Sequence, residues 1–154
     1  MAVEIHEDQP LPAPAVAPTR ELSAQFVVQL NYGAGTWWHP ARLDNGGKVW
    51  ASFRVPHDFN SFVSVEIVLW PGFTVVHNVT TDYYASQGGE AYNNHTQTTV
   101  TAPNVVLNTT YIMDALADAP AFWAALTPGD NVMIRMGSPV IRLLLAETVC
   151  VRYV

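Results

Sequence analysis

The chain has 154 residues, of which 49% are apolar and only 13% are charged, and its formal net charge at pH 7 is −6. This length is sufficient for one domain with a hydrophobic core. Lys48 is the only lysine and the arginines form no run. Binding driven by nucleic-acid phosphates and attraction to an anionic membrane are therefore both disfavoured.

Cys150 is the only cysteine. It excludes an intrachain disulfide and a cysteine-based zinc site. Because it lies in an alternating apolar segment near the C-terminus, we expect a buried and inert thiol, since a reactive one needs an exposed, electropositive setting.

The N-terminal residues predict an extended arm. Residues 9–18 read QPLPAPAVAP, and alternate prolines block helix and sheet pairing while favouring a polyproline-like path. Val3 and Ile5 alternate with polar residues ahead of it, so this tip has the pattern of an added strand. The alternative is an unattached tail. We predict an arm over residues 1–21 and a β domain over residues 22–154.

No targeting or membrane-spanning segment is predicted. Residues 1–9 are acidic and lack the pattern of a signal peptide. No apolar run approaches the roughly 20 residues that a bilayer-spanning helix needs. These features favour synthesis and retention in a cytoplasm, or assembly there into a particle.

Alternation of apolar and polar residues with a period of two dominates the rest of the chain and predicts half-buried strands. Turn sequences rich in Gly, Pro, Asn and Asp separate the alternating segments. One of them, residues 127–130, has Pro at the second and Gly at the third position of a turn. Residues 73–84 are expected to form either one long strand or two strands with a bend. The segments are residues 26–32, 48–55, 63–69, 73–84, 96–101, 105–113, 132–136, 141–145 and 148–154.

Residues 118–126 carry the one helical signal. Asp118 suits an N-cap and Pro120 suits the first turn of a helix. About eight or nine strands with one short helix predict an all-β fold, an antiparallel two-sheet sandwich or jelly roll. Without alternating helices, a parallel sheet is disfavoured.

No motif of catalysis or metal binding stands out. The five histidines lack metal-ligand spacing, and no Gly-x-Ser-x-Gly sequence is present. Asp114 and Asp118 would share a helix face, but a cap explains Asp118 and a turn explains Asp130. Carboxylates paired through space, as in glycosidases, stay open. We predict no enzyme activity, no metal and no cofactor.

Adjacent aromatic residues are candidates for a contact surface. Trp37 and Trp38 form one pair, and Tyr83 and Tyr84 form another near Tyr92. Flat rings beside Asn side chains are what a sugar-binding surface needs, and Tyr and Trp are also enriched in protein interfaces. A third interpretation is that one ring of each pair enters the core, as alternation demands.

Between Phe53 and Tyr153, a series of strand and turn pieces follows a familiar order. The pieces are Phe53–Pro56, Val63–Trp70, Asp82–Ala85 with Gly89–Glu90, Pro128–Met136 and Val151–Tyr153. In this layout the segment resembles phage-encoded structural β-sandwich domains, in particular head decoration proteins and fibre-attached domains. This resemblance implies a jelly-roll-like domain, commonly trimeric, on the outside of an icosahedral shell, with the arm before Leu22 as a tether. The arm and the Trp37–Trp38 pair depart from the common pattern.

Our main hypothesis from the sequence is a capsid decoration protein. It would bind the assembled shell and stabilise it by mass action, with the arm adding contacts at high effective concentration. The expected partners are the major capsid protein and copies of the chain in a homotrimer, and the expected place is the exterior of a virion assembled in a host cytoplasm. The alternative is a carbohydrate-binding module of a phage fibre or receptor-binding protein. The predicted contact residues are Val3, Ile5, Leu11, Pro12, Pro14 and Val16 in the arm, and Trp37, Trp38, Tyr83 and Tyr84 in the domain.

Overall fold

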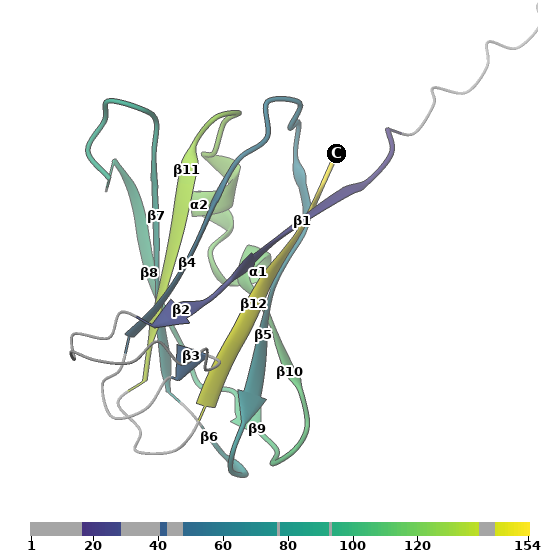
Figure 1. Cartoon of the computed structure of the whole chain (residues 1–154), viewed down its shortest axis with the longest axis vertical. Coiled ribbons are helices and arrows are strands. Elements are labelled where there is room, and N and C mark those ends of the chain that lie inside the picture. The colour runs from purple at the N-terminus through teal and green to yellow at the C-terminus, as the bar shows by residue number, and fades with distance from the viewer. Residues whose placement is uncertain (1–16, 29–40, 43–47, 77, 93, 139–143) are drawn as a thin grey trace, which may run out of the picture.

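The computed structural model of the chain describes residues 17–28, 41–42, 48–76, 78–92, 94–138 and 144–154. Two antiparallel sheets face each other as a sandwich (Figure 1). Sheet A contains β1 (Arg20–Gln25), β12 (Leu144–Tyr153), β5 (Phe62–Pro71) and β10 (Tyr111–Asp114) in that order, with β3 (Ala41–Arg42) also pairing with β12. Sheet B contains β2 (Val27–Val28), β4 (Lys48–Arg54), β11 (Asn131–Gly137), β7 (Val79–Ser86) and β8 (His95–Thr101). A small third pair joins β6 (Val75–Val76) to β9 (Asn104–Val105).

The predicted all-β antiparallel sandwich is confirmed. Its strands exist because alternate residues on each strand are apolar and can enter a shared core. In β7, the regular alternation buries Val79, Thr81, Tyr83 and Ala85 and leaves the residues between them facing outward. The core between the sheets is built mainly from such inward residues of β4, β5, β7, β11 and β12.

The beginning of the domain differs from the prediction for residues 26–32. The chain forms β1 over residues 20–25, which pairs with β12 of sheet A, and then passes to sheet B as the short β2. Residues 29–32 lie outside the described residues. β1 begins at Arg20, two residues before the predicted domain boundary, and its Leu22 and Ala24 pack against the core.

The end of the chain is one strand rather than two. The residues that face the core are Leu144 and Ala146 before Glu147 but Val149 and Val151 after it, so the alternation changes phase. A register shift between Ala146 and Thr148 absorbs the extra residue and keeps both halves facing the core. The change of phase therefore reflects a β-bulge inside β12. The predicted segment 141–145 falls partly outside the described residues.

The helical segment also differs from the prediction. Two short helices form, α1 (Ala115–Asp118) and α2 (Pro120–Ala124). Asp118 is not an N-cap: Asp114 caps α1, where its Oδ1 accepts a hydrogen bond from the N–H of Ala117 at 3.0 Å. Asp118 instead accepts hydrogen bonds from the hydroxyls of Tyr83 and Thr99. Pro120 stands in the first turn of α2, as predicted.

The helices fill the space between the two sheets (Figure 1). Phe122 and Trp123 of α2 are buried, and the indole Nε1 of Trp123 donates to the carbonyl oxygen of Ala115 at 2.6 Å. The Trp123 ring also contacts Phe62 and Tyr83, with ring centroids 5.3 and 5.6 Å away. This aromatic cluster closes one part of the core that the strands alone do not fill.

Three smaller expectations concern the turn at residues 127–130, Asp130 and Cys150. The turn at residues 127–130 is confirmed: the N–H of Asp130 donates to the Thr127 carbonyl at 3.1 Å, and Gly129 has a φ of +93°. Asp130 is a turn residue as predicted, since its Oδ2 accepts from the Thr127 N–H at 2.6 Å. Cys150, predicted to be buried, is only half-buried, because it lies on the outward side of β12.

Candidate functional site

The outward surface of sheet B is the candidate site, and we call its outward side chains the sheet B face. They arise from the same alternation that builds the core, since every second residue of a strand points away from it. The registers of the strands place five such residues in one row across the sheet. These are Val27, Trp50, Arg135, Asp82 and Thr98.

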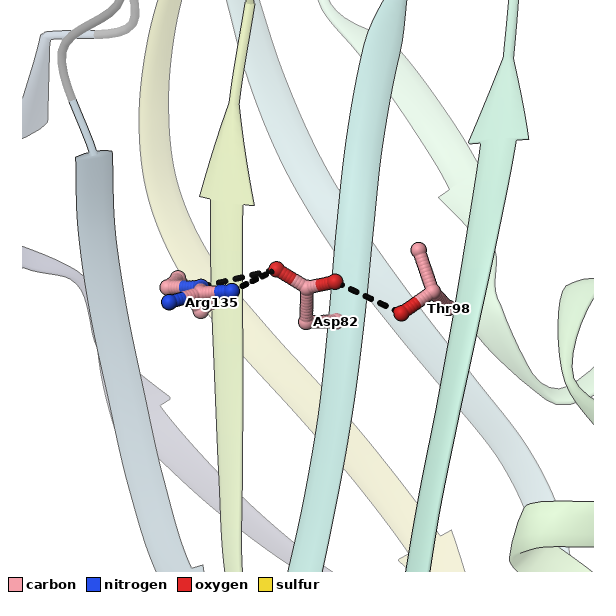
Figure 2. Close-up of polar contacts among 3 residues, drawn as sticks. All are labelled: Asp82, Thr98 and Arg135. Carbon is pink, nitrogen blue, oxygen red and sulfur yellow. Dashed lines mark hydrogen bonds and ion pairs between the residues drawn. The ribbon is translucent and has the colours of Figure 1, made fainter.

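A polar relay forms the middle of this row (Figure 2). Arg135 on β11 donates a hydrogen bond from Nε to Oδ2 of Asp82 on β7 at 2.7 Å, and its Nη2 forms an ion pair with the same oxygen at 2.6 Å. Thr98 on β8 donates its hydroxyl to the other carboxylate oxygen, Oδ1, at 2.7 Å. The side chains of Arg135 and Asp82 are only 26% and 14% exposed. Partial burial and charge-assisted bonds together hold these groups in one geometry.

Two aromatic rings flank the Arg135 guanidinium. Its central carbon lies 5.2 Å from the centroid of the Trp50 ring and 5.5 Å from that of the Tyr84 ring. Both distances suit cation–π attraction. Tyr84 in turn meets Tyr92, with centroids 5.9 Å apart and ring planes at 51°. Tyr92 is 66% exposed, so the pair of rings formed by Tyr84 and Tyr92 extends to open solvent.

Burial raises the pKa of Tyr84, and the negative charge of Asp82 raises it further. Like that of any tyrosine, the Tyr84 hydroxyl is protonated at neutral pH, so it is able to donate as well as accept a hydrogen bond. Together with the relay, the sheet B face offers rings, a donor and acceptors within a few residues of one another.

A pocket of about 350 Å³ opens at one end of the sheet B face. The next row of the sheet pairs Lys48 with Gly137 and Gly137 with Thr80. Gly137 adds no side chain between the two flanking residues, and it lines the pocket together with them. The lining residues are Lys48, Thr80, Asp82, Arg135, Met136, Gly137 and Ser138.

The structure separates the residues that the sequence grouped as contacts. Tyr83 is 0% exposed and its hydroxyl donates to Asp118 Oδ2 at 3.1 Å, so its ring is not accessible in the folded domain. Tyr84 points outward and belongs to the sheet B face. For this pair, one ring enters the core as alternation demands. The arm residues Val3, Ile5, Leu11, Pro12, Pro14 and Val16, and the pair Trp37 and Trp38, lie outside the described residues.

Sequence reasoning missed Trp50, Asp82, Thr98 and Arg135 as one group. The phase of the alternation does show that Trp50 and Arg135 face outward, since the residues beside each of them are apolar and buried. Their proximity depends on the register of β4 against β11 and of β11 against β7. No local pattern in one strand specifies the register with another.

The described residues form neither a metal-binding cluster nor a membrane-spanning helix. Within the ranges that the structure describes, no group of three or more His, Cys, Asp or Glu side chains is placed to hold a metal ion. The helices of those ranges are all too short or too polar to cross a membrane.

Comparison with known proteins gives a likeness of fold only. No family model and no curated protein matches the chain. Among solved structures, the chain is similar to the carbohydrate-binding module TmCBM61, determined in complex with β-1,4-galactotriose. The TM-score is 0.40 at 10% sequence identity, and the match covers 89% of this chain and 88% of that chain. So distant a likeness carries no information about function.

Proposed function

We propose that the chain is a carbohydrate-binding module and that the sheet B face is its sugar-binding surface. One observation carries this proposal: the Arg135–Asp82–Thr98 relay lies beside the rings of Trp50 and Tyr84 on an outward sheet face. A sugar ring presents C–H groups to an aromatic face and hydroxyls to donors and acceptors. Both kinds of partner are present within one row of the sheet.

The rigidity of the relay supports binding. Asp82 already accepts one hydrogen bond at each carboxylate oxygen and makes an ion-pair contact with Arg135 at Oδ2, so its carboxylate is oriented before a ligand arrives. A preorganised site loses less conformational entropy on binding than a mobile one. Because both oxygens of Asp82 are engaged, the arrangement favours a positioning role for this carboxylate over proton transfer.

Replacement of Trp50 tests the proposal. We expect Trp50→Ala to weaken the best glycan ligand by about tenfold or more, because it removes a stacking surface and one of the two rings beside Arg135. A glycan array would identify the ligand, and isothermal titration calorimetry would measure its dissociation constant.

Trp70→Ala is the matched control. Trp70 is 45% exposed and lies on β5 of sheet A, so the same substitution is made on the opposite face. We expect its affinity to equal that of the unchanged chain. Equal losses from both substitutions, or no glycan whose binding depends on Trp50, would contradict the proposal.

The capsid-decoration hypothesis stays a prediction from the sequence. It rests on the proline-rich arm, of which residues 1–16 lie outside the described residues. The part of it that the structure bears out is the β-sandwich domain. Mixing purified capsids with the full chain and with a chain lacking residues 1–19 tests it, since the tether hypothesis requires weaker particle binding by the shortened chain.

A further inference from the structure

The pocket beside the relay contains a cation that makes no ion pair within the described part of the chain. Lys48, the only lysine of the chain, lies at the start of β4, is exposed and lines the pocket. It makes no ion pair with any residue that the structure describes. The other charged groups among the described lining residues are Arg135 and Asp82, which neutralise each other through two contacts at 2.6 and 2.7 Å. The described lining of the pocket therefore carries one uncompensated positive charge.

The two outer faces of the sandwich differ in the sign of their charge. On the described strands of sheet B, three cations face outward with one carboxylate. On β1, β5, β10 and β12 of sheet A, whose side chains the structure describes, one guanidinium faces outward with four carboxylates. The groups are Arg54, Lys48, Arg135 and Asp82 on sheet B, and Arg152, Glu21, Glu66, Glu147 and Asp114 on sheet A.

This difference matters because the whole chain has a formal net charge of −6. An anionic ligand is repelled by the molecule at long range but meets a local excess of positive charge on the sheet B face. An uncharged sugar can accept a hydrogen bond from the ammonium of Lys48, but only an anionic sugar also gains an ion pair. The placement of the only lysine at this pocket thus favours a negatively charged ligand.

We propose that the sugar bound on the sheet B face is a uronic acid and that Lys48 binds its carboxylate in the pocket. This inference rests on the proposed function and names the class of glycan. The ammonium of Lys48 supplies the ion pair, and the hydroxyl of Thr80 lines the same pocket. Arg135 keeps its bonds to Asp82 and holds the rest of the ring beside Trp50 and Tyr84.

Pairs of glycans that differ only in charge test the inference. The probes are oligosaccharides of galacturonic, glucuronic and mannuronic acid, each beside its methyl ester, together with neutral and sulfated glycans on the same array. We expect an acidic oligosaccharide to bind best and methyl esterification to weaken it by about tenfold, as loss of one charge-assisted contact does. Added salt should weaken the acid but not the ester.

Lys48→Gln should abolish the preference for the acid over its ester. Arg152→Gln changes the net charge of the chain by the same amount on sheet A and should leave the preference intact. A calorimetric titration of each variant with the best acid and its ester supplies the dissociation constants.

The outcomes separate this inference from the proposed function. A neutral or sulfated glycan as the best ligand, with binding that depends on Trp50 and with uronates no better than their esters, would overturn the uronate assignment and leave the proposed function standing. An acid preference that survives Lys48→Gln would overturn the role of Lys48. Absence of any ligand that depends on Trp50 would remove the proposed function itself.

Discussion

At the scale of single residues, Tyr83 and Tyr84 show how one strand serves two purposes. They are neighbours in β7, yet one ring is buried among Phe122 and Trp123 and the other lies outward beside Arg135. The buried hydroxyl donates to Asp118 of α1, so it also ties sheet B to the helices. The two tyrosines are chemically equal, and only the phase of the strand distinguishes their roles.

Tyr83→Phe should lower the free energy of unfolding by about 1–2 kcal/mol, because it removes a hydrogen bond to the part-buried carboxylate of Asp118. Tyr84→Phe is the matched control and should change that free energy by less than about 0.5 kcal/mol, as outward substitutions usually do. Urea denaturation of both variants gives the comparison. A loss from Tyr83→Phe no larger than that from Tyr84→Phe would contradict a stabilising role for the hydrogen bond to Asp118.

The same residue predicts a dependence on alkaline pH. Burial, followed by the charge of Asp118, raises the pKa of Tyr83 far above its usual value of about 10. Above pH 10 the unfolded chain therefore releases a proton that the folded chain keeps, so the free energy of unfolding falls as pH rises. The contribution of this group is at most about 1.4 kcal/mol per pH unit.

The Tyr83→Phe variant lacks this group, so its stability should fall less steeply. Urea denaturation at pH 9, 10 and 11 would measure the two slopes. Parallel slopes would contradict a raised pKa at Tyr83.

At the scale of the elements, glycines fix the turns that set strand registers. Gly89, between β7 and β8, has a φ of +92°, and the N–H of Glu90 donates to the Gln87 carbonyl at 3.1 Å. A residue with a side chain is strained at such a φ. This turn places Asp82 opposite Thr98, so the geometry of the relay depends on it.

Gly89→Ala should lower the free energy of unfolding by about 1 kcal/mol because of the strain at positive φ. Gly88→Ala is the control: an added Cβ meets nothing within 4 Å at either position, and only Gly89 has a positive φ. Chemical denaturation of both variants would show the difference. An equal loss from Gly88→Ala would show that the destabilisation comes from changes in solvation or packing and not from backbone strain at Gly89.

At the scale of the whole molecule, β1 belongs to the sandwich, although its first two residues, Arg20 and Glu21, fall within the predicted arm. β1 pairs with β12 along its full length, from Arg20 opposite Tyr153 to Gln25 opposite Thr148. Thr148 also donates its hydroxyl to the Ala24 carbonyl at 3.1 Å. The first strand and the last strand of the domain therefore hold each other in place.

Two truncations should differ sharply in stability. Removal of residues 1–19 leaves β1 intact and should change the free energy of unfolding by less than about 0.5 kcal/mol. Removal of residues 1–25 also deletes Leu22 and Ala24 from the core and should cost about 2–4 kcal/mol. Thermal and urea denaturation would measure both, and a large loss from the shorter truncation would show that the arm is part of the fold.

The sequence by itself determined the fold class and most of the strands. Its period-two alternation over residues such as 48–55 and 63–69 follows directly from burying one side of each strand. The turn at residues 127–130 followed from its Pro and Gly. These features are local, so a single stretch of chain specifies them.

Only the tertiary structure decided the bulge in β12, the role of Asp118 and the composition of the sheet B face. Four different strands contribute to this face the residues Trp50, Asp82, Thr98 and Arg135. They meet because the strands pair in a particular register, which places Trp50 opposite Arg135 although the two lie 85 positions apart in the sequence. Register depends on how all the strands pack together, because a shift of one residue reverses the face of every side chain. Composition showed that Lys48 was the only lysine, but the packed sheet placed it at a pocket beside Arg135 and Asp82.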